Sequence, residues 1–164
     1  MRRFAVAFTG PSGSGKTTLI EKISTILTQT REVAIIKHDP KDKGVFDREG
    51  KDSYKFSQTG AEVVVTSPSR TTYFSQRNRD LDEIIQMFNH FDILLVEGLK
   101  TLPLPRIAIF RERIDESYLD YSEAIAIDQS IDLDKYTIPS HIDILDLNNT
   151  QEIIEWIDNH AKSL

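Results

Sequence analysis

An eight-residue run near the start of the chain constrains its fold more than any other feature. The residues Gly10-Pro11-Ser12-Gly13-Ser14-Gly15-Lys16-Thr17 match the pattern G-x-x-x-x-G-K-[ST] at every fixed position. In this pattern glycines let the backbone curl so that its N–H groups face a phosphate, and the lysine reaches the β- and γ-phosphates. The threonine hydroxyl is a ligand for the Mg²⁺ ion that bridges those phosphates. The motif therefore predicts a site for a nucleoside triphosphate and Mg²⁺ around Lys16 and Thr17.

The sequence on either side of this phosphate loop meets the structural context that the motif requires. Residues 4–8 form a short apolar run, which is typical of a strand buried on both faces. From Lys16 to about Gln29 the apolar residues recur at helical spacing. Residues 33–36 are a second apolar run, so the order predicts two parallel strands joined by a right-handed helical crossover. A tight Gly-rich turn without a ligand is the weaker alternative, because such a turn does not need this context.

The remaining apolar runs predict an α/β fold of the P-loop NTPase type, with an open, mostly parallel β-sheet flanked by helices on both faces. Further strands are expected at 63–66, 71–74, 93–96, 107–110 and 124–127, and further helices at 52–59, 80–88 and 149–161. Asp80 with Glu83, and Asn149 with Glu152, have the spacing of capping boxes. No segment is long enough to act as a linker, so the whole chain, 1–164, is predicted to be a single nucleotide-binding domain.

Composition narrows the classes of site and partner. The chain has no cysteine, which excludes disulfides, thiolate zinc sites and cysteine nucleophiles, and its four histidines are scattered. No apolar stretch approaches the ~20 residues that cross a bilayer, and the N-terminus does not have the pattern of a signal peptide. We therefore expect a cytoplasmic protein with no membrane partner. The net charge of −6 disfavours a nucleic-acid partner, although the first 60 residues hold 11 Lys and Arg against 7 Asp and Glu.

Charged residues follow two of the predicted strands at the edge where such sheets bind ligands. Glu97 ends the run 93–96, and it is expected to hold Mg²⁺ directly or through a water. Lys37, His38 and Asp39 follow the second strand in the same way. Lys37 is a candidate phosphate contact, Asp39 a candidate Mg²⁺ ligand, and His38 either a base or a packing residue. A solvated charge at a strand end is the alternative for each of them.

Some signatures of related nucleotide-binding proteins are absent from the sequence. There is no Asn-Lys-x-Asp run, by which Ras-like GTPases read guanine. There is no Arg-rich lid of the nucleotide-kinase type, although Arg111 and Arg113 could mimic one. The identity of the base therefore does not follow from these residues.

Several motifs taken together, and in this order, resemble one family. They are Gly10–Thr18, Lys37-His38, Gly50-Lys51-Asp52-Ser53-Tyr54, Gly60-Ala61 and Asp92–Lys100. The set is similar to the MobB family of molybdopterin-guanine dinucleotide biosynthesis adapter proteins, and the resemblance covers nearly the whole chain. It implies a GTP-binding protein with weak GTPase activity that assists the guanylyltransferase joining GMP to molybdopterin.

The resemblance also implies site residues and an assembly. The residues carried over are Gly10, Pro11, Ser12, Gly13, Ser14, Gly15, Lys16, Thr17, Thr18, Lys37, His38, Asp47, Gly50, Lys51, Asp52, Glu97 and Lys100. The family implies a homodimer, with the arm around residues 100–110 pairing at the interface. It leaves open whether the chain binds molybdopterin, or its guanine dinucleotide form, directly. Relatives often carry more histidines where this chain has Asp39-Pro40-Lys41, so no histidine metal site is expected there.

An ATP-dependent small-molecule kinase or ligase on the same scaffold is the alternative function. In such an enzyme Asp39 would bind the metal ion and Lys37 would handle a substrate. In the GTP-binding function Lys16, Glu97 and Lys37 are the residues expected to act on the phosphates. No residue stands out as a strong base, which fits slow hydrolysis better than fast transfer.

Overall fold

A computed structural model describes residues 3–164, and these residues group into two compact units. Unit 1 comprises the residues up to His38 together with His90–Leu164, and unit 2 comprises Asp39–Asn89. Each unit has its own sheet. The predicted single domain thus contains a large sheet, which carries the phosphate loop, and a separate two-stranded one.

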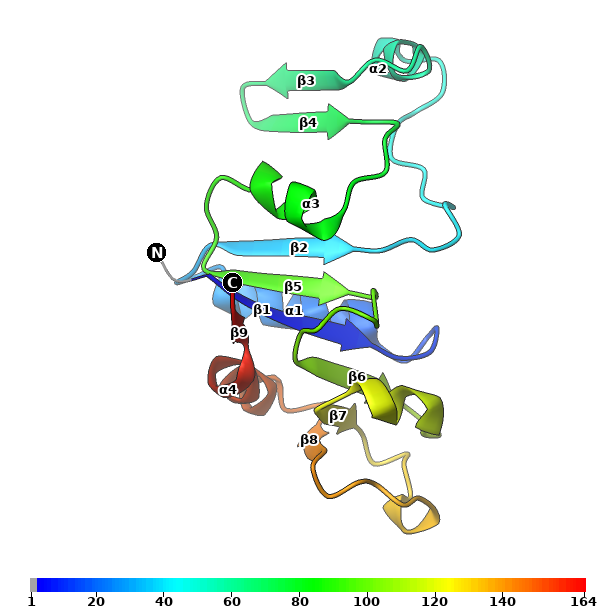
Figure 1. Ribbon diagram of the computed structural model, residues 1–164, viewed down its shortest axis with the longest axis vertical. Coiled ribbons are helices and arrows are strands. Elements are labelled where there is room, and N and C mark those ends of the chain that lie inside the picture. The colour runs from blue at the N-terminus through cyan, green and yellow to red at the C-terminus, as the bar shows by residue number, and fades with distance from the viewer. Residues whose placement is uncertain (1–2) are drawn as a thin grey trace. The chain divides into compact units, whose positions relative to one another are not determined.

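Unit 1 is built on a seven-stranded sheet whose order is β2-β5-β1-β6-β7-β8, with β9 paired to the beginning of β1 (Figure 1). The strands are β1 (Phe4–Thr9), β2 (Val33–Lys37), β5 (Ile93–Glu97), β6 (Arg106–Phe110), β7 (Ala124–Ile127), β8 (Asp143–Asp146) and β9 (Lys162–Ser163). All pairs except β1–β9 are parallel. β2 and β5 lie to one side of β1, and β6 lies to the other. This makes the carboxyl end of β1 a switch point, where open α/β sheets bind ligands.

The strands of unit 1 are apolar because both faces of the sheet are covered. On one face α1 (Lys16–Leu27) and α4 (Thr150–His160) pack against the central strands, and their buried side chains form one cluster with those of β1, β5 and β6. On the other face a smaller cluster joins β6 and β7 to the 3₁₀ helix η1 (Glu116–Tyr121). A second 3₁₀ helix, η2, spans Leu133–Lys135. The α/β fold with an open, mostly parallel sheet is confirmed.

Unit 2 contains a long loop, two short helices and a hairpin. Helix α2 spans Asp52–Ser57, the antiparallel strands β3 and β4 span Val63–Ser67 and Arg70–Phe74, and α3 spans Leu81–Met87. The capping box predicted for α3 is present. The Asp80 carboxylate accepts the Glu83 N–H at 2.9 Å, and the Glu83 carboxylate accepts the Asp80 N–H at 3.0 Å.

Every predicted helix and strand is found, and two strands were not predicted. Strand β8 has only one buried residue, Leu145, and β9 has only the two polar residues Lys162 and Ser163. Strand β9 is held by backbone pairing, which leaves no apolar pattern in the sequence. Strand β8 is short, and its Leu145 packs in the core while Ile144 is exposed, so its pattern is weak. The capping box predicted for α4 is half formed, since Asn149 accepts the Glu152 N–H at 3.2 Å.

The structure shows that only part of the arm around residues 100–110 could pair in a dimer. Strand β6 occupies the second half of that arm, and its two edges pair with β1 and β7. All five residues of β6 are buried. Strand pairing with a second copy is therefore closed to residues 106–110.

No helix in residues 3–164 is long and apolar enough to cross a membrane.

Candidate functional site

The phosphate loop connects the end of β1 to the start of α1, as the motif requires. Gly10 has φ +139° and Gly15 has φ +98°, which are backbone conformations that side chains disfavour. A Cβ atom at residue 10 would lie 2.4 Å from the carbonyl oxygen of Ile109 on the neighbouring strand β6. The loop therefore follows its path only with glycine at position 10, which lies against the backbone of β6.

The Lys16 side chain lies across this loop. Its Nζ atom donates hydrogen bonds to the carbonyl oxygens of Gly10 at 2.8 Å and Pro11 at 2.7 Å. Burial lowers the pKa of Lys16 below the ordinary 10.5, Glu97 acts in the opposite direction, and Lys37 lowers it further. Ser14, also in the loop, has a buried hydroxyl oxygen without a hydrogen-bond partner among the described residues. An ammonium group and an unpaired hydroxyl in one loop fit a bound anion.

Glu97 and Lys37 end adjacent parallel strands in matching register. Their side chains form an ion pair, with Lys37 Nζ 3.7 Å from Glu97 Oε2, and the Glu97 side chain is mostly buried. The His38 N–H donates to the Glu97 carbonyl at 3.0 Å, which ties the two strand ends together. A cavity of about 470 Å³ is lined by Thr17, Lys37 and Glu97, among others. The structure therefore brings together Lys16, Thr17, Lys37 and Glu97, as the sequence predicted.

These groups have the chemistry that a nucleoside triphosphate and Mg²⁺ require. The Thr17 hydroxyl and the Glu97 carboxylate are oxygen donors, which Mg²⁺ prefers, and they line the same cavity. The loop N–H groups and the start of α1 favour negative charge, and Lys16 supplies a full positive charge. The residues present thus fit a phosphate group and its metal ion.

Asp39 belongs to unit 2, where its carboxylate holds a turn. It accepts N–H groups from Lys41 at 3.2 Å, from Lys43 at 2.7 Å and from Gly44 at 2.6 Å. Three backbone donors to one carboxylate give Asp39 a structural role that the sequence did not indicate. A metal ion would compete with these donors for the same oxygens.

The predicted residues between 47 and 52 also belong to unit 2. Asp47 accepts the Arg48 N–H at 2.8 Å and the Ser53 hydroxyl at 3.0 Å, and its second carboxylate oxygen is buried without a partner among the described residues. Gly50 takes φ +87°, and Lys51 is the N-cap residue of α2, which begins at Asp52. These contacts shape the loop, and the predicted role of these residues at a phosphate stays a prediction.

Lys100 lies in unit 1, against aromatic rings. Its ammonium nitrogen is 5.3 Å from the centre of the Tyr118 ring and 5.8 Å from that of Tyr121. Such cation–π contacts hold a lysine side chain in one orientation. Its predicted contact with a ligand also stays a prediction.

Arg106 organises the segment after Glu97, and sequence reasoning missed this role. Its side chain is fully buried and donates to the carbonyl oxygens of Gly98 at 2.9 Å, Leu99 at 3.0 Å and Leu102 at 3.2 Å. Burial lowers its pKa, and the nearby Glu123 carboxylate opposes that shift. Pro103 and Pro105 mark this segment as extended, but nothing in the sequence indicates that a buried charge holds it.

Arg111 is a second residue whose place was not predicted. It follows β6 directly, and its guanidinium carbon lies 3.4 Å from where a Cβ of Gly15 would be. The sequence indicated it only as a possible mimic of a kinase lid. The reasoning applied to Glu97, a charge directly after a buried parallel strand, would have placed it at the phosphate loop.

The part of the chain that forms this site is similar to a family of known proteins. A family model described as "Molybdopterin guanine dinucleotide synthesis protein B" matches residues 5–129, a range that includes the phosphate loop, Lys37 and Glu97. The chain belongs to the MobB family. The sequence-based resemblance to this family is thereby confirmed.

Individual members of the family match over most of their length. The molybdopterin-guanine dinucleotide biosynthesis adapter protein of Haemophilus influenzae is 31% identical over 163 residues, covering 94% of this chain and 87% of the relative. The adapter protein of Escherichia coli is 28% identical and covers 93% of this chain and 92% of its own. The crystal structure of Bacillus subtilis MobB superposes with a TM-score of 0.76 at 24% identity, covering 97% and 98% of the two chains. The structural match supports the fold alone, and the sequence matches support the family.

Proposed function

We propose that this chain is a GTP-binding adapter with weak GTPase activity that assists the conversion of molybdopterin to molybdopterin guanine dinucleotide. The observation that carries the proposal is the complete phosphate loop with Lys16, Thr17 and Glu97 gathered at one sheet edge, in a chain of the MobB family. The relatives named above are adapter proteins of this biosynthesis.

Different groups of the chain bind the phosphates and the metal ion. The loop N–H groups and Lys16 hold and neutralise the β- and γ-phosphates, and Thr17 and Glu97 hold Mg²⁺. Bound Mg²⁺ supplies further charge stabilisation at the same oxygens. Glu97 is paired with Lys37 at 3.7 Å, so its carboxylate is not free to act as a base. A site that stabilises charge but lacks a free base binds GTP well and hydrolyses it slowly.

We also propose a ligand contact for each of the other residues that the sequence predicted at the site. His38, Asp47, Gly50, Lys51, Asp52 and Lys100 are proposed to contact the nucleotide or the pterin, and Asp39 to assist the metal ion. Asp39 is the weakest of these, because three N–H groups already use its carboxylate. The same proposal includes direct binding of molybdopterin, or of its guanine dinucleotide form, by these residues.

The proposed partners are a second copy of the chain and the molybdenum cofactor guanylyltransferase, in the cytoplasm. Unit 2 supports the homodimer, because its sheet has only two strands and such a hairpin is marginally stable by itself. Val64 and Val65 point to opposite faces of β3, and they are 56% and 42% exposed. A second copy would cover these side chains and extend the sheet.

The function is tested with purified guanylyltransferase and molybdopterin. We expect this chain to raise the yield of the guanine dinucleotide, and the Lys16→Ala variant to raise it much less. A parallel titration should show binding of GTP in preference to ATP. Preference for ATP, together with rapid transfer to a small acceptor, would contradict the adapter function and favour a kinase or ligase.

A further inference from the structure

We infer that Arg111 is a phosphate-binding residue of the nucleotide site, in addition to Lys16 and the residues of the loop. The inference rests on the proposed function, because it needs a phosphate in the loop. It adds a second full positive charge, which approaches the loop from the side of β6 rather than from α1.

The sheet itself brings Arg111 to the loop. Strands β1 and β6 are parallel, with Thr9 beside Ala108, so their carboxyl ends lead to the same sheet edge. From this edge β1 continues into the loop, and β6 continues into Arg111. Three atoms of the guanidinium group lie 3.4–3.5 Å from where a Cβ of Gly15 would be. The guanidinium group therefore lies within van der Waals distance of that position, directly against the loop at Gly15.

Neighbouring loops hold Arg111 in this position. Phe110 pairs with Ile127, so Arg111 and Asp128 follow adjacent strands side by side. The Nε atom of Arg111 is 3.5 Å from Asp128 Oδ2. The Ser130 N–H and hydroxyl both donate to the other oxygen of Asp128, and the Ser130 hydroxyl oxygen accepts the Glu112 N–H at 2.7 Å. Asp128 and Ser130 thus fix both the side chain and the backbone of the turn at 111–112.

This arrangement leaves the outer face of the guanidinium group available. The ion pair with Asp128 is made through Nε, and within residues 3–164 the two terminal NH₂ groups form no hydrogen bond with a protein acceptor. The side chain is 44% exposed, so a ligand in the loop can reach it. Two parallel N–H groups match two oxygens of a phosphate, which makes arginine well suited to bidentate phosphate recognition.

Arg113 provides a matched control for the experiment. It lies in the same turn, is exposed, and carries the same charge. Replacing Arg111 or Arg113 by glutamine changes the net charge equally. Any general effect of charge on nucleotide binding is therefore the same in both variants.

The experiment titrates GTP, and separately inorganic pyrophosphate, with Mg²⁺ into the full chain. We expect Arg111→Gln to weaken the binding of both ligands roughly 10- to 100-fold, because pyrophosphate tests the phosphate contact without the base. Arg113→Gln should stay within about twofold of the unchanged chain. Arg111→Lys should recover only part of the loss, because lysine keeps the charge but not the paired donors. The melting temperature of each unliganded variant reports whether the fold is intact.

The outcomes separate this inference from the proposed function. If the unchanged chain binds GTP and Lys16→Ala does not, while Arg111→Gln and Arg113→Gln bind equally, the role of Arg111 is wrong and the function stands. If the unchanged chain binds neither ligand, both fail. Should Arg111→Gln fail to fold, full GTP affinity in Arg111→Lys would equally overturn the inference.

Discussion

At the scale of the residue, two glycines of the phosphate loop differ in what they tolerate. A Cβ at Gly10 would meet the Ile109 carbonyl oxygen at 2.4 Å, whereas a Cβ at Gly13 has no neighbour within 4 Å. Both have positive φ, +139° and +76°. The two glycines therefore differ in the space that is available for a Cβ atom. Their positive φ values alone do not distinguish them.

Substitution by alanine should reveal this difference. We expect Gly10→Ala to lower the free energy of unfolding by about 3 kcal/mol, because backbone strain adds to a clash with main chain. Gly13→Ala should lower it by about 1 kcal/mol, from strain alone. Urea denaturation of the two variants measures both values. Equal losses would show that β6 does not constrain the loop at Gly10.

Lys16 predicts a dependence of nucleotide affinity on alkaline pH. Burial lowers its pKa in the free chain below 10.5, and phosphate binding needs the charged ammonium form. As the pH rises through this lowered pKa, the affinity for GTP should fall by up to about tenfold per pH unit, beginning below pH 10.5. Calorimetry from pH 7 upward to pH 10.5, in buffers with different ionisation enthalpies, measures the decline and the proton taken up. An affinity that stays constant to pH 10.5 would contradict this role.

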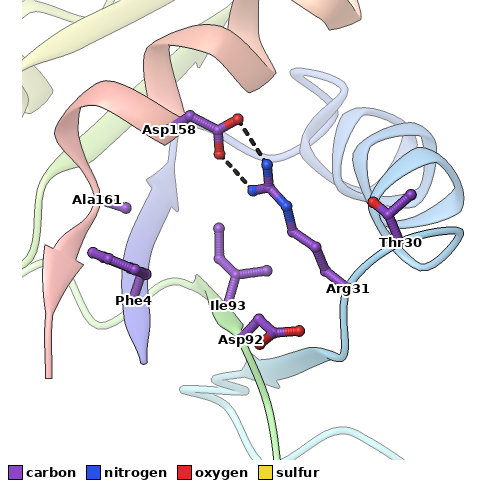
Figure 2. Close-up of a pocket in the computed structure, with 7 residues that line it drawn as sticks. All are labelled: Phe4, Thr30, Arg31, Asp92, Ile93, Asp158 and Ala161. Carbon is purple, nitrogen blue, oxygen red and sulfur yellow. Dashed lines mark hydrogen bonds and ion pairs between the residues drawn. The ribbon is translucent and has the colours of Figure 1, made fainter. Parts of the chain in front are cut away.

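At the scale of the element, an ion pair connects the helices on one face of the sheet. Arg31, just after α1, reaches Asp158 on α4, with Nη2 at 2.9 Å from Oδ2 (Figure 2). This bridge lines a cavity of about 420 Å³, together with Phe4, Ile93 and Ala161. Hydrogen bonding to Asp158 raises the pKa of Arg31. The pair therefore holds the α1–β2 turn against α4.

We expect Arg31→Met to lower the free energy of unfolding by about 0.5–1 kcal/mol at low salt. The effect is small because the two side chains are 35% and 39% exposed, so water and salt screen the charges. Thermal melting in 20 mM and 500 mM NaCl measures it, and the difference should shrink at high salt. A loss that does not depend on salt would assign the stabilisation to packing of the arginine stem instead.

The elements also show which parts of the fold the sequence determines. Strands β1 and β5 were predictable because they are buried on both faces and therefore apolar throughout. The phosphate loop and Glu97 were predictable because each has a fixed place relative to such a strand. Strand β9 was not predictable, because only its backbone takes part in pairing. The position of Arg106 depends on which strands become neighbours, and the order along the chain does not reveal that.

At the scale of the whole molecule, the proposed dimer depends on the hairpin of unit 2. We expect replacement of both Val64 and Val65 by lysine to give a monomer, because charges on β3 oppose both burial and strand pairing with a second copy. The affinity for GTP should stay the same, because the phosphate loop belongs to unit 1. Analytical ultracentrifugation measures the mass in solution. A double variant that stays dimeric would move the interface elsewhere, for example to residues 100–105.

The account as a whole depends on a nucleoside triphosphate binding at Lys16. The most direct measurement is calorimetric titration of GTP with Mg²⁺ into the unchanged chain and into Lys16→Ala. The two proteins should have similar melting temperatures, because Lys16 is only partly buried and bonds only to carbonyl oxygens of its own loop. The account predicts saturable binding to the unchanged chain and a loss of at least about 100-fold in the variant. Equal GTP affinity in the two folded proteins would contradict it.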